Sequence, residues 1–159
     1  MLSLIVLTSF FAIKLFSQAP SDEVQIEYMA HLAGLGDSPW VLQPNQCGTT
    51  GQNRPIEGFA IRLAHGSKPI KLRYKAHLQN SGDTDWYFLG QYCGTKGQKM
   101  RVEAIWIEVT SGYSQNYEIY YRAHIAHQGW TGWYKNGEML GSRGTGKAIE
   151  AIEIYVSDN

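Results

Sequence analysis

The chain has 159 residues, with 14 basic and 14 acidic side chains and a formal net charge of zero. It contains 17 glycines, 10 tyrosines and 5 tryptophans, and only 18% of its residues are charged. Because no basic stripe is present, a nucleic-acid or anionic-membrane surface is disfavoured. The composition is typical of a compact all-β extracellular domain rather than a disordered or coiled-coil chain.

The first 19 residues differ from the rest of the chain. They are almost wholly apolar, are interrupted by Lys14, and end in Ser17-Gln18-Ala19, with small residues where a signal peptidase would cut. The apolar run is shorter than the roughly 20 residues that a membrane span needs. We therefore expect residues 1–19 to be a cleaved signal peptide, with an uncleaved anchor as the alternative. Residues 20–159 would form a secreted domain that does not insert into the membrane.

One unit occurs three times, at residues 26–63, 72–109 and 119–156, with offsets of 46 and 47 residues. A repeat of this period points to a single domain with threefold pseudo-symmetry. The positions that align most clearly are a tyrosine, a histidine, a tryptophan and a glutamate: Tyr28, Tyr74 and Tyr121; His31, His77 and His124; Trp40, Trp86 and Trp133; Glu57, Glu103 and Glu150.

Each repeat opens and closes with a long stretch in which apolar residues alternate with polar ones, which indicates half-buried strands. Two short strands lie between them, and Asn136-Gly137 in the third repeat is a hairpin signal. No helical pattern of useful length is present. The expected fold is all-β, with four strands per repeat. A β-trefoil is preferred and a β-prism is the alternative.

The third repeat carries a set of recognisable motifs: Tyr121-x-Ala-His124, Gly129-Trp130-x-x-Trp133, Asn136-Gly137-Glu138 and Ile149-Glu150-Ala151-Ile152. These motifs resemble the clostridial hydrophobic repeat with an invariant tryptophan, the ChW repeat, over residues 26–156. The first two repeats depart from it, since they have Asp37 and Asp83 in place of Trp130. The resemblance implies export and binding at cell surfaces or to extracellular polymers, without catalysis.

The tryptophans divide into two groups. Trp40, Trp86 and Trp133 recur at one position, and we expect them to fill equivalent core pockets, with stacking on sugar rings as the alternative. Trp130 occurs in the third repeat only, in a loop where symmetry does not require it. It is therefore a candidate ligand contact.

The repeated histidines and glutamates have structural explanations. His31, His77 and His124 face outward, and we expect hydrogen bonds to the backbone of the following loop, with a glycan contact as the alternative and no metal site. The repeated glutamates share a face with the core aliphatics. Each is predicted to be a structural clamp held by backbone N–H groups of the preceding Gly-Thr/Ser-x-Gly turn, rather than a glycosidase acid.

Two further groups leave alternatives open. Asp37, Asp83 and Gln128 lie in the loop before the shared tryptophan, where they could bind sugar hydroxyls or simply cap a turn. Gln128 aligns with Asp83 to within about one residue. Cys47 and Cys93 occupy matching positions, so they are either a disulfide or two buried thiols.

The expected function is a secreted, non-enzymatic, lectin-like module that recognises a cell-surface or extracellular polysaccharide. Its candidate ligand contacts are Trp130, Asp37, Asp83, Gln128, His31, His77 and His124. No catalytic residue, cofactor or metal is expected. The alternative is a structural or adhesive protein that binds other proteins or copies of itself at a cell surface.

Overall fold

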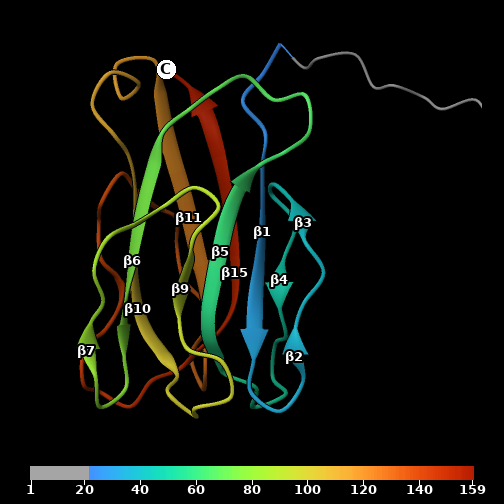
Figure 1. Cartoon of the computed structure of the whole chain (residues 1–159). Helices are drawn as coiled ribbons and strands as arrows, with labels where there is room; N and C mark the ends of the chain where they lie inside the picture. Colours follow the sequence, from blue (N-terminus) through green and yellow to red (C-terminus); the bar gives the residue numbers. More distant parts are fainter. Residues whose placement is uncertain (1–21) are drawn as a thin grey trace, which may run out of the picture.

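The computed structural model describes residues 22–159, so the expected signal peptide lies outside the described residues. Within that range, no helix is long and apolar enough to cross a membrane. All the regular elements there are strands (Figure 1). The all-β class and the threefold repeat are therefore confirmed.

Each repeat contributes two long strands and three short ones. The long strands are β1 (Ile26–Leu32), β5 (Ile56–Leu63), β6 (Leu72–Leu78), β10 (Val102–Val109), β11 (Tyr117–Ile125) and β15 (Ile149–Asp158). The short strands are β2 (Gly36–Asp37), β3 (Val41–Leu42), β4 (Cys47–Gly48), β7 (Gly82–Asp83), β8 (Tyr87–Phe88), β9 (Tyr92–Gly94), β12 (Gly129–Trp130), β13 (Tyr134–Lys135) and β14 (Leu140–Gly141).

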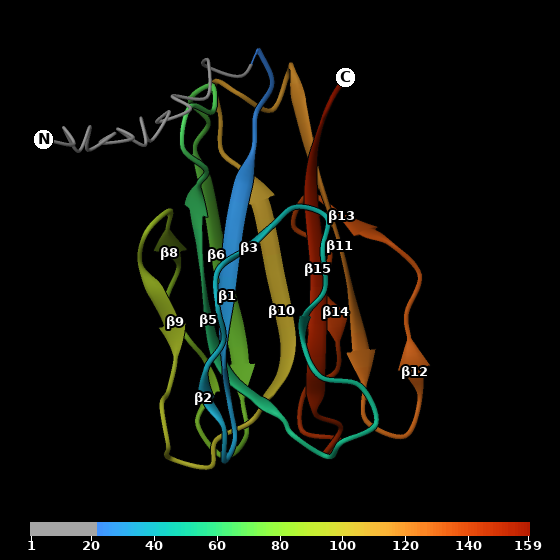
Figure 2. The same ribbon diagram turned by 90° about the vertical axis from the view of Figure 1, so that its right-hand side faces the viewer.

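The strands form three five-stranded sheets, each built around the two long strands of one repeat. The opening long strand pairs with two short strands of its own repeat. The closing long strand pairs with a short strand of the next repeat: β9 pairs with β5, β14 with β10, and β4 with β15. In Figure 2 the segment that contains β4 crosses over β15. The first repeat thus completes the sheet of the third, and the ring of repeats is closed.

This arrangement corrects the preference for a trefoil. A trefoil barrel would join the long strands of different repeats, whereas here each long strand pairs with the other long strand of its own repeat. Three separate sheets around one axis are the prism alternative. The physical reason lies at the sheet edges, because the exchanged short strand covers the edge that a barrel would have used for closure.

The core lies between the three sheets, and a repeated tyrosine connects its neighbours. Tyr74 is fully buried, donates its hydroxyl hydrogen to the carbonyl of Gln91 in its own repeat, and accepts the backbone N–H of Ile61 in the preceding repeat at 3.2 Å. Tyr28 accepts the N–H of Ile154 at 3.1 Å, which links the first repeat to the third. The buried hydroxyl therefore satisfies a backbone group of the adjacent sheet.

The repeated glutamates do not face the core, contrary to the prediction. The pairing of β1 with β5 shifts by one residue near His31, so Leu32 lies opposite Ile56 and Glu57 is the extra residue of a bulge. The isoleucine takes the inward place, and the carboxylate turns toward the neighbouring repeat.

The clamp role itself is confirmed in two repeats, but the donor differs from the predicted one. Glu57 accepts the backbone N–H of Lys99 at 2.9 Å, and Glu103 accepts that of Gly144 at 3.0 Å. Both donors belong to the following repeat: Gly144 is the last residue of its Gly-Thr/Ser-x-Gly turn, and Lys99 lies two residues after that turn. Because both glutamates are nearly fully buried, these bonds offset the cost of removing a carboxylate from water.

Candidate functional site

The shared tryptophans lie on the outer surface of the sheets, so the prediction that they fill the core is wrong. Trp40 is 36% exposed and Trp133 is 42% exposed, while Trp86 is partly exposed. The tyrosines described above already occupy the repeated aromatic place in the core. An arginine guanidinium covers each indole: Arg62 lies 4.0 Å from Trp40, Arg73 lies 4.4 Å from Trp86, and Arg122 lies 4.8 Å from Trp133.

One outward cross-strand pair differs between the repeats. In the first repeat it is Glu27 with Arg62, joined by an ion pair at 2.7 Å. In the second it is Arg73 with Glu108, an ion pair of reversed order at 2.5 Å. The third repeat has two tyrosines at this position, so its outer face is aromatic where the other two are ionic.

Those tyrosines begin a continuous row of rings on the outer face of the third sheet. Tyr120 stacks on Tyr155, with ring centroids 5.0 Å apart and planes at 12°. Tyr155 in turn meets Trp133 edge-on, with centroids 5.0 Å apart and planes at 78°.

The row continues through a guanidinium to the tryptophan that is unique to this repeat. Arg122 lies 4.8 Å from the Trp133 ring and 4.9 Å from the Trp130 ring, and Glu153 binds its Nε at 2.7 Å. Trp130 then packs edge-on against His124, with centroids 5.7 Å apart. We call this set the repeat-3 strip: Tyr120, Tyr155, Trp133, Arg122, Trp130 and His124.

Sequence reasoning named Trp130 and His124 as candidate contacts, but it did not name Tyr120 or Tyr155, and it placed Trp133 in the core. A signal was present for the two tyrosines. They occupy outward positions in the alternating pattern of β11 and β15, where the matching positions of the other repeats carry charges.

Asp37 and Asp83 are engaged by the protein itself. Asp37 contacts His31 at 2.6 Å and Lys96 of the next repeat at 2.6 Å. Lys96 above all, and then His31, hold the pKa of this carboxyl below its ordinary value. The aspartate therefore bridges two repeats.

Asp83 has the same role at the next junction. It contacts His77 at 2.7 Å and Arg143 of the third repeat at 3.0 Å. The Arg143 guanidinium is the main cause of a pKa that lies well below the usual range for a carboxyl. The histidines thus bind carboxylates and not the loop backbone that was predicted.

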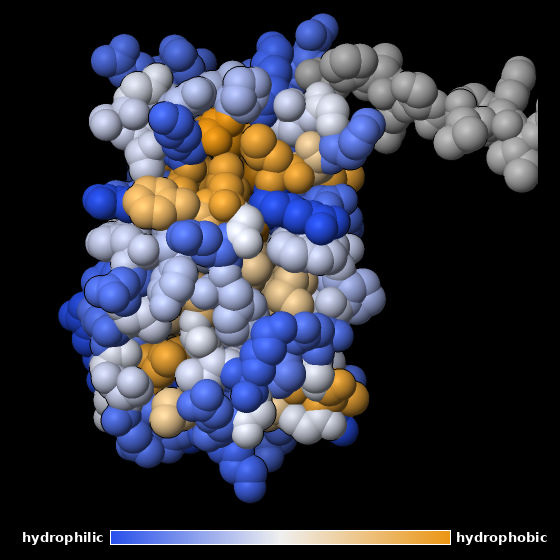
Figure 3. All heavy atoms as spheres, in the orientation of Figure 1, coloured by the Kyte–Doolittle hydropathy of each residue, from blue (hydrophilic) through white to orange (hydrophobic). Residues whose placement is uncertain are grey.

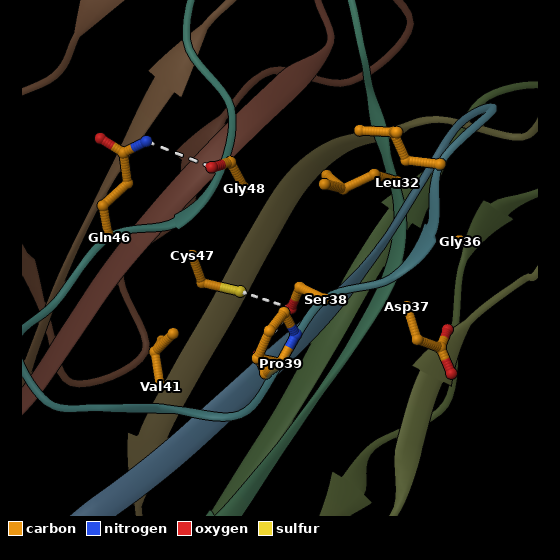
Figure 4. Close-up of a pocket in the computed structure, with 10 residues that line it drawn as sticks. Leu32, Gly36, Asp37, Ser38, Pro39, Val41, Gln46, Cys47 and Gly48 are labelled. Carbon is orange, nitrogen blue, oxygen red and sulfur yellow. Dashed lines mark hydrogen bonds between the residues drawn. The ribbon is translucent and has the colours of Figure 1, made fainter.

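A cavity of about 370 Å³ lies beside Asp37 in the first repeat, but the aspartate does not serve it (Figure 4). Figure 4 shows the carboxylate pointing away, whereas Leu32, Val41 and Pro39 line an apolar wall. Cys47 points its Sγ toward the Ser38 hydroxyl at 3.3 Å. The cavity therefore offers few polar groups for a sugar.

The third repeat brings together a different set. Trp130 pairs with His124 at the register where the other repeats have their aspartates, and Gln128 lies two residues earlier. The predicted alignment of Gln128 with Asp83 is therefore wrong. The Nδ1 of His124 lies 3.1 Å from Glu150, and His124, Gln128 and Glu150 line a cavity of about 320 Å³.

Both cysteines are free and buried, which corresponds to the thiol alternative. They belong to different sheets, since Cys47 lies in β4 beside β15 and Cys93 lies in β9 beside β5. Burial raises the pKa of the Cys93 thiol to about 11 and also raises that of Cys47. Thiols with raised pKa values are poor nucleophiles at neutral pH.

Within residues 22–159, no group of histidine, cysteine, aspartate or glutamate side chains is arranged to hold a metal ion. No curated protein and no solved structure matches the chain. Three segments, residues 31–65, 77–111 and 124–158, match the model of a family described as Clostridial hydrophobic W. Each segment begins at the outward histidine of an opening long strand and ends at the last residue of the closing strand or two residues beyond it. The chain belongs to the Clostridial hydrophobic W family.

Proposed function

We propose that the protein is a secreted, non-enzymatic binding module that recognises extracellular or cell-surface polysaccharide, with the repeat-3 strip as its principal contact surface. The observation that supports this proposal is the replacement of an outward ion pair by the Tyr120–Tyr155 stack in one repeat only. A structural need of the ring would apply equally to all three repeats.

The chemistry of the strip suits sugar rings. The apolar face of a pyranose stacks on indole and phenol rings, and Trp133 offers 42% of its surface for such a contact. Polar groups lie at the margin, because Glu118 accepts the Tyr120 hydroxyl at 2.5 Å and Lys135 lies 3.3 Å from Glu118. These groups can form hydrogen bonds with sugar hydroxyls, which fix orientation more than they add affinity.

A polysaccharide would also present its rings repeatedly to the three outer faces. Trp40 and Trp86 offer partly exposed indoles on the other two sheets. Weak additional contacts of this kind raise the apparent affinity for a long polymer through multivalency. Secretion would place the module where such polymers occur.

The experiment is a glycan-array screen of residues 20–159 beside Trp130→Ala and Trp133→Ala. We expect selective binding to a few glycans and a loss of at least about tenfold in apparent affinity for each variant. Leu35→Ala serves as the control, because Leu35 is 57% exposed and lies outside the strip. A folded wild-type protein that binds no glycan would refute the proposal.

The second candidate is an adhesive protein that binds proteins or copies of itself. It is favoured by an apolar surface between the ends of β5 and β6 (Figure 3). A groove of about 420 Å³ lies in this region, lined in part by Leu89 and by Phe88, which is 52% exposed. Sedimentation velocity over a range of concentrations tests it, with Phe88→Ser expected to abolish any self-association. A monomer at all concentrations would contradict self-assembly.

A further inference from the structure

The three junctions between neighbouring repeats are not equivalent. Two of them are closed by an ion pair between the turn of one repeat and the short strand of the preceding one. Lys96 reaches Asp37 at 2.6 Å, and Arg143 reaches Asp83 at 3.0 Å. Both cations occupy the same position of their repeats.

The third junction, between the third repeat and the first, lacks both partners. Thr50 stands at the position of the cation, and Trp130 stands at that of the aspartate. The space beside this junction is a cavity of about 320 Å³. At the first junction, the cavity beside Glu57 is about 110 Å³, and Lys99 and Arg101 are among the residues that line it.

Several of the residues that line the larger cavity carry polar side chains. Glu150 is 3% exposed, and its carboxylate is oriented by the Nδ1 of His124 at 3.1 Å. Asn53 of the first repeat and His127 and Gln128 of the third also line the cavity. Amide and imidazole groups supply both donors and acceptors, while the carboxylate supplies acceptors.

We propose that this cavity is a second carbohydrate subsite, which binds a single pyranose residue; the inference rests on the proposed function. Vicinal hydroxyls would donate to Glu150 and exchange hydrogen bonds with Asn53 and Gln128. Ligand pockets start at roughly 300 Å³, so a volume of about 320 Å³ suits one ring rather than an oligosaccharide. A buried carboxylate that is already oriented loses little entropy on binding.

The position of the cavity relates it to the repeat-3 strip. His124 belongs to both, since it lines the cavity and packs against Trp130 with centroids 5.7 Å apart. A glycan with one residue in the cavity can therefore place its adjoining residues on the strip. The cavity then selects the sugar, and the strip adds contact area.

The matched test variant is Asn53→Lys. Asn53 has φ +52°, and Lys99, at the same position of the second repeat, already adopts φ +58°. The substituted chain is therefore expected to fold while its longer, charged side chain fills the cavity beside Glu150. Glu150→Gln is the second variant, because it keeps the shape of the cavity and removes the charge. Lys99→Asn, the reciprocal change at the first junction, is the control.

The measurement is NMR titration of ¹⁵N-labelled residues 20–159 with the methyl glycosides of glucose, galactose, mannose and N-acetylglucosamine. We expect at least one of them to shift the backbone amides of Gly51, Asn53 and Gln128 in a saturable way. Asn53→Lys and Glu150→Gln should each weaken that binding by about tenfold or more, and Lys99→Asn should leave it unchanged.

Three outcomes would overturn the inference. Shifts confined to Trp133 and Tyr155 would locate monosaccharide binding on the strip alone and leave the proposed function intact. If the backbone amides beside the cavity still shift in both variants, with unchanged affinity, then Asn53 and Glu150 do not contact the sugar as proposed. No shift with any of the four glycosides would refute the subsite, while the glycan array separately decides whether the strip binds polymer.

Discussion

The inside and the outside of this ring follow different rules. Inside, the hydroxyl groups of Tyr28 and Tyr74 each accept a backbone N–H from a neighbouring repeat. Outside, the position that holds the Arg73–Glu108 ion pair in one repeat holds the Tyr120–Tyr155 stack in another. The interior is constrained because each repeat completes its neighbour's sheet and hydrogen bonds. The outer faces are free of that constraint, and they are where the repeats have diverged.

The largest expected effect comes from disrupting a close backbone approach between two repeats. The position concerned is glycine in all three repeats. A Cβ on Gly94 would lie 2.5 Å from the carbonyl oxygen of Glu57, at φ +111°. Because backbone atoms on both sides would have to move, Gly94→Ala should lower the free energy of unfolding by about 3 kcal/mol.

Gly97→Ala is the matched control for that change. Gly97 also has a positive φ, at +66°, but nothing lies within 4 Å of its added Cβ. Urea denaturation should give it a loss of only about 1 kcal/mol. Equal losses at both glycines would mean that the close approach between repeats contributes nothing.

The next effect should come from the tyrosine hydroxyl. Tyr74→Phe leaves the backbone N–H of Ile61 and the carbonyl of Gln91 without their buried partner. We expect a loss of about 2 kcal/mol by chemical denaturation, because buried polar groups lose their hydrogen bonds. Tyr155→Phe, on the outer face, should stay within about 0.5 kcal/mol. A comparable loss at both would contradict the distinction between interior and surface.

Alkaline pH should lower the stability of the protein through the buried thiols of the first two repeats. The third repeat has Leu140 at the matching position and contributes no such effect. The pKa of Cys93 is raised to about 11, above an unfolded value near 8.5. A raised pKa gives stability that is complete below the unfolded value and is lost as pH rises toward the folded one. The free energy of unfolding should therefore fall between about pH 8.5 and 11.

Cys93→Val should flatten that decline, by an amount on the order of 2 kcal/mol. Urea denaturation of both proteins at several pH values measures it. Tyr74, whose pKa burial raises to about 12, adds a further loss in both proteins above about pH 10, the ordinary pKa of a tyrosine, so the difference between the two proteins and not the total decline reports on Cys93. Identical pH profiles for the two proteins would show that Cys93 does not ionise on unfolding in this range.

The smallest effect should come from the junction ion pairs. Arg143→Ala removes the bridge to Asp83, and both side chains are partly exposed. Exposed pairs contribute about 1 kcal/mol or less, and salt screens them. We expect a small loss in dilute buffer that shrinks further in about 1 M salt. A large, salt-independent loss would place this pair among the interior contacts.

The sequence predicts which residues are buried in this molecule better than it predicts which strands pair. Alternation identifies Tyr28 and Tyr74 as inward residues, and the structure confirms both as fully buried. The exchange of short strands was not predictable, because β9 has the same local pattern whether it pairs with its own repeat or with the preceding one. The choice between trefoil and prism depends on which long strands pair with each other, and the local pattern does not specify that pairing either.

The candidate site was only partly predictable for a related reason. Repetition shows that Trp133 has equivalents in every repeat, but it cannot say whether the repeated environment is a core pocket or a covered surface. Glu57 was placed on the core face because a strict period of two has no place for a bulge. Trp130 was identified correctly as distinct, since a departure from symmetry is visible in sequence.

The most direct test of the difference between the repeats is to compare Trp40→Ala, Trp86→Ala and Trp133→Ala for binding to one polysaccharide selected on the array. The three indoles occupy equivalent positions and each is covered by an arginine, so the substitutions are matched. We expect Trp133→Ala to weaken binding by at least about tenfold and the other two to change it by about threefold or less. Equal losses at all three would contradict the account, because recognition would then follow the symmetry of the ring and not its departure in the third repeat.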